Sequence, residues 1–148
     1  MIDKNIGFIG LGNVGSKLAN NILQANFNLF IYDLDQRTSN KLIKKGAIWK
    51  NNIKEILENS SIVITCLPSP RAVIKVVEKK QGFVNYINHR HLWIEMSTTD
   101  ENEMIRLSKL IESKGANVLE APITGGQHKA ESGNISVLAA GKRKNFDR

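Results

Sequence analysis

Three glycines, Gly10, Gly12 and Gly15, fall within six positions directly after an apolar run. Such spacing suits a phosphate group, because glycine lets the backbone turn tightly and lets an anion approach peptide N–H groups without meeting a Cβ atom. Asp33 follows Gly15 by 18 positions (33 − 15), close to the roughly 20 expected of a carboxylate that accepts hydrogen bonds from ribose hydroxyls. Together these residues predict a site for a dinucleotide.

Each glycine has a separate task in such a turn. Gly10 makes the tight turn, Gly12 leaves room for the pyrophosphate, and Gly15 lets the following helix pack closely on the strand, while free N–H groups at the helix start bind the anion. The alternative is that the glycines only connect a strand to a helix, with Asp33 an ordinary polar residue at a strand end. The predicted cofactor contacts of this region are Gly10, Leu11, Gly12, Asn13, Val14, Gly15 and Asp33.

Asp33 also bears on the choice of dinucleotide. A carboxylate at this position repels the 2′-phosphate of NADP, so the sequence favours NAD. Arg37 lies just beyond Asp33 and is a cation that can contact such a phosphate, which keeps NADP open as the cofactor.

Strand and helix patterns alternate along the whole chain, and these elements must position the turn. Strands are expected at Asn5–Ile9, Phe27–Asp33, Ala47–Trp49, Ile62–Leu67, His91–Ser97, Asn117–Ala121 and Ile135–Ala140. Helices are expected after the glycines, over Thr38–Lys45, around Ile53, Ile56 and Leu57, over Arg71–Lys80, and from Asp100 to Gly115, with a turn starting Gly125–Ser132. The alternation predicts an α/β fold of the Rossmann type, doubly wound, with a mainly parallel sheet and helices on both faces.

The composition is that of one globular domain. With 148 residues, 41% of them hydrophobic, the chain can bury one sizeable core, and we expect a dinucleotide-binding domain over residues 1–148. No stretch reaches the roughly 18 to 20 apolar residues of a membrane span, and no secretory leader is visible, so a cytoplasmic protein without membrane contact is expected. The single cysteine, Cys66, is expected to be a small buried side chain.

The formal net charge of +7 raises the question of a nucleic-acid partner. The basic residues are scattered in small clusters next to glycines or near expected helix ends, where they complement the helix dipole. The sequence shows neither a helix-turn-helix spacing nor the aromatic-basic pattern of a single-strand RNA platform. We therefore expect a solvated basic surface and no nucleic-acid partner.

Other residue types that carry chemistry are few. His89 and His91 stand close together, but no cysteine or acidic cluster accompanies them as metal ligands, so we expect surface or strand-edge histidines and no metal site. Glu95 and Glu120 end expected strands near the cleft, where side chains of open α/β sheets contact ligands. Nothing fixes the separation of these two carboxylates, so a paired-carboxylate hydrolase is not supported.

Four segments, taken together, resemble the β-hydroxyacid dehydrogenase family. They are "GFIGLGNVGSKLANNIL", "CLPSPRAV" (Cys66–Val73), "EMSTTDENE" (Glu95–Glu103) and "EAPITGGQHKAESGN" (Glu120–Asn134), in order along essentially the whole chain. The family includes 3-hydroxyisobutyrate dehydrogenase, tartronate semialdehyde reductase and, more distantly, 6-phosphogluconate dehydrogenase. The resemblance implies an oxidoreductase that interconverts a short 3-hydroxy acid and its 3-oxo acid by hydride transfer, with NAD or NADP as cofactor.

The resemblance also implies individual contacts. The implied cofactor contacts are Leu67, Pro68 and Thr98, and the implied contacts to the substrate are Ser97, Thr124, Gly125 and Gly126. Thr124 replaces a serine that is usual in the family, which keeps a hydroxyl beside two glycines whose N–H groups can converge on a carboxylate. From the residues alone, "ITGG" is equally a turn between a strand and a helix, and "STTD" is sufficiently explained as a helix N-cap.

The family's catalytic lysine lies in a Lys-x-x-Asn-Asn type of motif on a long helix of a second, helical domain that also forms the dimer interface. Beyond the nucleotide-binding segments, the sequence through Arg148 carries no such motif on a long helix, so no catalytic residue is expected in this chain and a homo-oligomer is expected only with the helical domain. We expect a truncated form or fragment that binds the cofactor with little turnover of its own. The alternative is a non-enzymatic NAD(H)-sensing module, against which the "APITGG" segment speaks.

Overall fold

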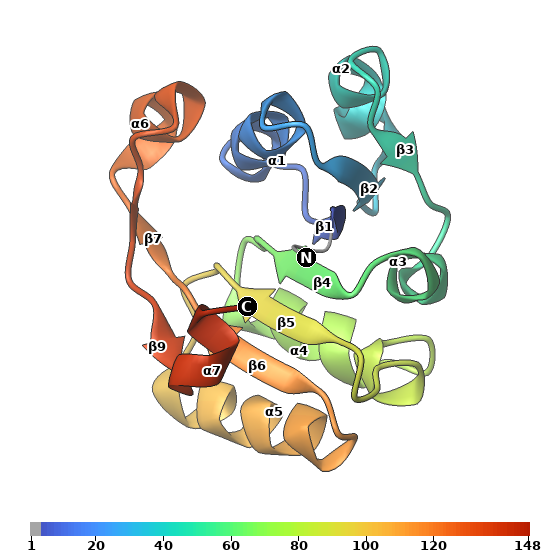
Figure 1. Cartoon of the computed structure of the whole chain (residues 1–148), viewed down its shortest axis with the longest axis vertical. Coiled ribbons are helices and arrows are strands. Elements are labelled where there is room, and N and C mark those ends of the chain that lie inside the picture. Colours follow the sequence, from blue (N-terminus) through green and yellow to red (C-terminus); the bar gives the residue numbers. More distant parts are fainter. Residues whose placement is uncertain (1–3) are drawn as a thin grey trace.

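A seven-stranded sheet organises the computed structural model, which describes residues 4–148 (Figure 1). Its strands lie in the order β3 (Ile48–Trp49), β2 (Asn28–Tyr32), β1 (Asn5–Ile9), β4 (Ile62–Thr65), β5 (Leu92–Glu95), β6 (Asn117–Glu120) and β9 (Ala140–Gly141). Every neighbouring pair is parallel except β6 and β9. A separate antiparallel ribbon pairs β7 (Ile123–Thr124) with β8 (Ser136–Val137).

Helices cover both faces of the sheet. One face carries α1 (Gly15–Gln24), α2 (Asn40–Ile43) and α6 (Gly126–Ser132), and the other carries α3 (Ile53–Asn59), α4 (Pro70–Glu78) and α5 (Glu101–Ser113). Shorter helical segments are η1 (Gln36–Ser39), η2 (Phe83–Asn85) and α7 (Arg143–Phe146). The predicted doubly wound Rossmann-type α/β fold, with a mainly parallel sheet, is therefore confirmed.

Two apolar clusters, one on each face, hold the helices against the sheet. Leu18 of α1 packs with Ile31 of β2 on one face, and Leu107 of α5 packs on the other face around Trp93 of β5. The Trp93 ring meets the ring of Phe83 edge-on, with 5.7 Å between the centroids. Burial of each such side chain is worth about 1.5 to 3 kcal/mol, so the central strands and their carboxyl ends are firmly placed.

Two sequence predictions on the elements were wrong. The expected helix over Thr38–Lys45 is divided into the 3₁₀ turn η1 and the short helix α2. The turn starts early because the side chain of Asp35 accepts a hydrogen bond from the N–H of Arg37. The expected single strand Ile135–Ala140 is also divided, since β8 pairs with β7 whereas β9 pairs with β6 and forms the edge of the main sheet.

The segment between β6 and β9 forms an arm that leaves the sheet. Figure 1 shows α6 beside α1, far from β9. The amide of Asn21 donates a hydrogen bond of 2.7 Å to the carbonyl of Ala130, and the Lys17 ammonium donates one of 3.3 Å to Gln127. The arm therefore returns residues that follow β6 to the helix that begins at the glycine turn.

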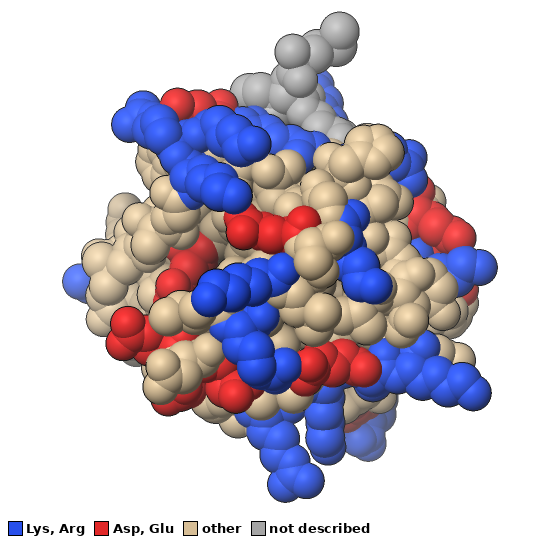
Figure 2. Space-filling model, turned by 90° about the horizontal axis from the view of Figure 1, so that it is seen from below, with Lys and Arg blue, Asp and Glu red and all other residues tan. Residues whose placement is uncertain are grey.

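Basic and acidic side chains are mixed on one face of the molecule (Figure 2). On the face shown in Figure 2, lysines and arginines lie among clusters of Asp and Glu. None of the helices within residues 4–148 has the length and apolar character that crossing a bilayer requires.

Candidate functional site

A cavity of about 980 Å³ lies at the carboxyl ends of the central strands. β1 and β4 are neighbours there, and the chain continues from β1 to α1 on one face and from β4 to α4 on the other. In open α/β sheets, this reversal of direction creates the crevice in which ligands bind. The cavity is lined by the glycine turn, the end of β2, the loop after β4 and one side of α4.

The three glycines meet three different requirements. Gly10 has a φ of +100°, and a Cβ atom on it would lie 2.2 Å from the carbonyl oxygen of Cys66. A Cβ atom on Gly15 would lie 2.0 Å from the carbonyl oxygen of Gly10, so α1 can approach β1 this closely only with glycine there. Gly12 has neither constraint, because no atom of residues 4–148 outside its immediate chain neighbours lies within 4 Å of the position of its Cβ. Open space at this bare backbone fits the pyrophosphate of a dinucleotide.

The backbone of the turn offers hydrogen-bond donors to that space. Helix α1 has no side-chain cap and no acidic residue in its first turn. Among residues 4–148, no acceptor is paired with the N–H groups of Gly12, Asn13 and Val14. Unpaired N–H groups at a helix start carry a partial positive charge, and they bind phosphate oxygens well.

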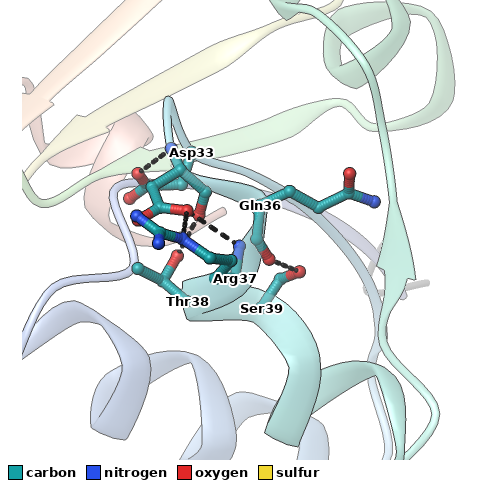
Figure 3. Close-up of polar contacts among 6 residues, drawn as sticks. Asp33, Gln36, Arg37, Thr38 and Ser39 are labelled. Carbon is teal, nitrogen blue, oxygen red and sulfur yellow. Dashed lines mark hydrogen bonds and ion pairs between the residues drawn. The ribbon is translucent and has the colours of Figure 1, made fainter.

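Asp33 is fixed at the opposite edge of the turn. Its Oδ2 accepts a hydrogen bond of 2.6 Å from the N–H of Leu11, and its Oδ1 accepts one of 2.9 Å from the N–H of Asp35. Figure 3 shows Asp33 above the loop that follows β2. Each carboxylate oxygen has two lone pairs, so each can accept a further hydrogen bond from a ribose hydroxyl.

Arg37, the alternative contact for a 2′-phosphate, is held by Asp35. The guanidinium donates hydrogen bonds of 2.9 Å from Nε to Oδ1 and 2.8 Å from Nη2 to Oδ2 (Figure 3). These hydrogen bonds lower the pKa of the Asp35 carboxyl and raise the pKa of Arg37. The Arg37 side chain is 88% exposed and is absent from the lining of the large cavity.

A buried carboxylate connects the two loops on the other side of the cavity. Glu95, at the end of β5, is fully buried and accepts hydrogen bonds from the hydroxyl of Thr65 and from the N–H of Ser97, the latter at 2.6 Å. The indole N–H of Trp93 donates to the Thr65 hydroxyl at 2.8 Å. The Ser97 hydroxyl in turn accepts a hydrogen bond of 2.8 Å from the N–H of Leu67, so the network ties the loop after β4 to the loop after β5.

The network affects two ionisable groups. Burial raises the pKa of Glu95, while hydrogen bonds from Ser97 and Thr65 oppose the shift and the charge of Glu120 adds to it. Burial, with the charge of Glu95, also raises the pKa of the Cys66 thiol to about 11. Cys66 therefore stays a protonated thiol at neutral pH. It is only partly buried and lines the cavity, so the expectation of a buried side chain was wrong.

The structure brings most of the predicted cofactor contacts together. Those that line the cavity are Gly10, Gly12, Asn13, Val14, Gly15, Asp33, Leu67 and Pro68. Leu11 is buried beneath them and contributes its N–H to Asp33. Thr98 is exposed and does not line this cavity.

The predicted substrate contacts are less closely gathered. Ser97 is 5% exposed and uses its hydroxyl to hold the loop after β4. Thr124, Gly125 and Gly126 are exposed and do not line the cavity, but Gln127, the next residue, does. The arm thus places this segment at the border of the cavity.

The expectation of a surface or strand-edge position was wrong for His91. Its side chain is buried, with Nε2 2.9 Å from the carbonyl oxygen of Leu57 and Nδ1 3.0 Å from the N–H of Asn88. Because the ring satisfies backbone groups inside the protein, it is a structural residue, whereas His89 is exposed. No group of three or more His, Cys, Asp or Glu within residues 4–148 is arranged to hold a metal ion.

The sequence interpretation missed one feature of the cavity. Three basic side chains line the cavity opposite the glycine turn: Arg71 and Lys75 of α4, and Lys79 at the C-terminal end of this helix. Their spacing of four residues within the expected helix Arg71–Lys80 would have placed them on one helix face.

Comparisons with known proteins agree with this geometry. Residues 5–148 match the family described as the NAD binding domain of 6-phosphogluconate dehydrogenase. The chain belongs to this family. The NAD(P)-binding character of the domain and the resemblance found in the sequence are thereby confirmed.

Relatives of this chain are longer than the chain itself. The chain is 32% identical over 141 residues to the cytokine-like nuclear factor N-PAC of Pongo abelii, and the match covers 95% of this chain and 26% of the relative. It is 31% identical over 144 residues to the mitochondrial 3-hydroxyisobutyrate dehydrogenase of Drosophila melanogaster, covering 97% and 44%. The solved structure of Psf3 in complex with NADP+ and 2-OPP shares the fold, with a TM-score of 0.92, 22% identity, and coverage of 96% and 50%. The chain thus spans half or less of the length of these relatives.

Alanine substitutions at two glycines of the turn separate ligand contact from packing. Gly15→Ala is expected to lower the free energy of unfolding by about 2 to 3 kcal/mol, because the methyl group overlaps the Gly10 carbonyl oxygen. Gly12→Ala is expected to unfold within about 0.5 kcal/mol of the wild type and yet to bind NADH at least about tenfold more weakly. Urea unfolding and NADH fluorescence titration measure both effects. Unchanged NADH binding in Gly12→Ala would show that the turn does not hold the phosphates.

Glu95 is expected to make stability depend on pH. Because its folded pKa is raised above the unfolded value, the stability it contributes is full below the ordinary glutamate pKa of about 4.3 and is lost as pH rises through the raised value. Glu95→Gln removes this titration. The wild type should therefore lose stability relative to Glu95→Gln as pH rises from about 4, measured by urea unfolding at a series of pH values. Parallel curves would show that Glu95 keeps an ordinary pKa.

Proposed function

We propose that this domain binds NAD(H) as the cofactor half of an oxidoreductase that interconverts a short 3-hydroxy acid and its 3-oxo acid. The observation that carries the proposal is the open space at the Cβ position of Gly12, faced by the unpaired N–H groups of Gly12, Asn13 and Val14. The name of the Drosophila relative, a 3-hydroxyisobutyrate dehydrogenase, supports the substrate class.

The residues have separate roles in this proposal. The glycine turn holds the diphosphate, Asp33 accepts hydrogen bonds from the adenosine ribose, and Leu67-Pro68 support the cofactor from the loop after β4. The nicotinamide ring supplies hydride transfer when the cofactor is bound. Glu95 holds the loops after β4 and β5 in register through Thr65 and Ser97.

We propose that the substrate carboxylate lies at the border of the cavity. The hydroxyl of Thr124 and the exposed backbone of Gly125 and Gly126 are adjacent to Gln127, which lines the cavity. A Cβ atom on Gly126 would have no neighbour within 4 Å, so its backbone is open to an anion. Thr98 is exposed in the loop between β5 and α5, where a bound cofactor and substrate can contact it.

A preference for NAD over NADP follows from the charges after β2. Asp33 repels a 2′-phosphate, and Arg37 can approach one only by leaving the carboxylate of Asp35. We expect the wild type to bind NADH at least about tenfold more tightly than NADPH. Asp33→Asn keeps an acceptor for the N–H of Leu11 and removes the charge, so the affinities for NADH and NADPH should become more similar. Arg37→Ala should leave the affinity for NADPH unchanged. Fluorescence titrations with both cofactors measure this, and equal affinities in the wild type contradict it.

Turnover requires a group that the described residues do not supply. In the family that the sequence resembles, a lysine on a helix beyond the nucleotide-binding domain moves the proton of the reacting hydroxyl. Residues 1–148 carry no such helix after the nucleotide-binding segments. We therefore expect the chain to bind NADH while oxidising 3-hydroxyisobutyrate at no more than the background rate. Absorbance at the NADH band measures this, with a full-length 3-hydroxyisobutyrate dehydrogenase as the positive control. A rate comparable to the control would contradict the assignment of a cofactor half.

The alternative is a non-enzymatic module that senses NAD(H). The observation that favours it is the match to N-PAC, whose name denotes a nuclear factor and which is as similar to this chain as the dehydrogenase is. A sensor binds the dinucleotide tightly without another domain, while a half-enzyme gains productive binding when a helical domain is added. Titration with and without that domain separates the two.

A further inference from the structure

One face of α4 carries a row of basic side chains along the cavity. Arg71, Lys75 and Lys79 are four residues apart, and all three line the cavity that the glycine turn also lines. Val73 and Val77 of the same helix are fully buried in the core. Each valine lies two residues, or roughly 200°, from a member of the row, so the row is on the side of α4 that points away from the core.

The charge of this row is not compensated by protein groups. Among residues 4–148, none of its three members forms an ion pair, whereas Glu78, the one acid of α4, is held by Arg106 at 2.6 Å. The charged residues that line the cavity are this row and Asp33. Three cations against one carboxylate give the described lining a net charge of +2.

The row extends from the loop after β4 to the end of β2, and a dinucleotide bound in the cavity has to reach both. Arg71 is in the first turn of α4, directly after the loop that carries Pro68. The ammonium group of Lys79 lies 5.9 Å from the centroid of the Tyr32 ring, and Tyr32 immediately precedes Asp33. Eight residues of helix cover about 12 Å, so the row runs beside the cavity from the loop after β4 to the end of β2.

We propose that Arg71, Lys75 and Lys79 form a second wall of the cofactor site, which attracts and pairs with the phosphates of a dinucleotide from the side opposite the glycine turn. The proposal rests on the proposed function of the cavity. Its chemical basis is complementarity: the net +2 of the lining matches the two negative charges of a diphosphate. The glycine turn contributes directed N–H groups, and the α4 row contributes formal charge that acts over a longer range.

The test compares two double variants that lose the same charge. Lys75→Ala/Lys79→Ala removes two members of the row, and Lys80→Ala/Lys114→Ala removes two exposed lysines that do not line the cavity. NADH titrations at low and high salt give the affinity and its salt dependence. The first variant should bind NADH roughly three- to tenfold more weakly and lose part of the salt dependence, while the second should stay close to the wild type.

A charge-conserving variant excludes a packing effect. Lys75→Arg/Lys79→Arg should bind NADH as the wild type does, and thermal unfolding without ligand shows whether each variant is folded. If the wild type binds NADH and both alanine variants bind it equally well, the second wall is refuted while the proposed function stands. If the wild type binds neither NADH nor NADPH, the proposed function is refuted and the wall with it.

Discussion

The contact between Gly15 and the carbonyl of Gly10 is the constraint on which the site depends. A single Cβ atom at Gly15 would lie 2.0 Å from that oxygen, so this contact sets how closely α1 approaches β1. Close approach places the first N–H groups of α1 beside the end of β2, where Leu11 reaches the carboxylate of Asp33. The parts of the cavity proposed to bind phosphate and ribose are thus joined through backbone geometry.

The loops on the other side of the cavity are held by different means. Glu95 is buried where β4 and β5 end in register, with Thr65 opposite it. A buried carboxylate is costly unless it is well hydrogen-bonded, and Thr65 and Ser97 supply the donors. Removing a partner would leave an unsatisfied polar group, so the network holds both loops in one arrangement.

The sequence predicted the parts of the structure that depend on local patterns. The apolar strands and the glycine turn follow from periodicity and from the freedom of glycine at Gly10 and Gly15. The division of the expected strand Ile135–Ala140 was not predictable, because it depends on pairing with β7 and β6, which are distant contacts. The burial of His91 has the same cause, since its partner Leu57 is 34 positions away. The position of Asp33 at the cavity was predictable from its spacing after the glycines, but its hydrogen bond from the N–H of Leu11 was not.

The two walls of the cavity differ in what they contribute to recognition. Backbone N–H groups at the glycine turn are fixed by the fold, so they favour one geometry of the ligand and act only at contact distance. The side chains of Arg71, Lys75 and Lys79 are long and adaptable, so they discriminate little between geometries but attract an anion before it docks. In the proposed site, Asp33 is the one acid among the described lining residues, so its charge would repel the 2′-phosphate of NADP without cancelling that attraction. Under the two proposals, selectivity would come from the turn and Asp33, and the affinity for phosphate would come from both walls.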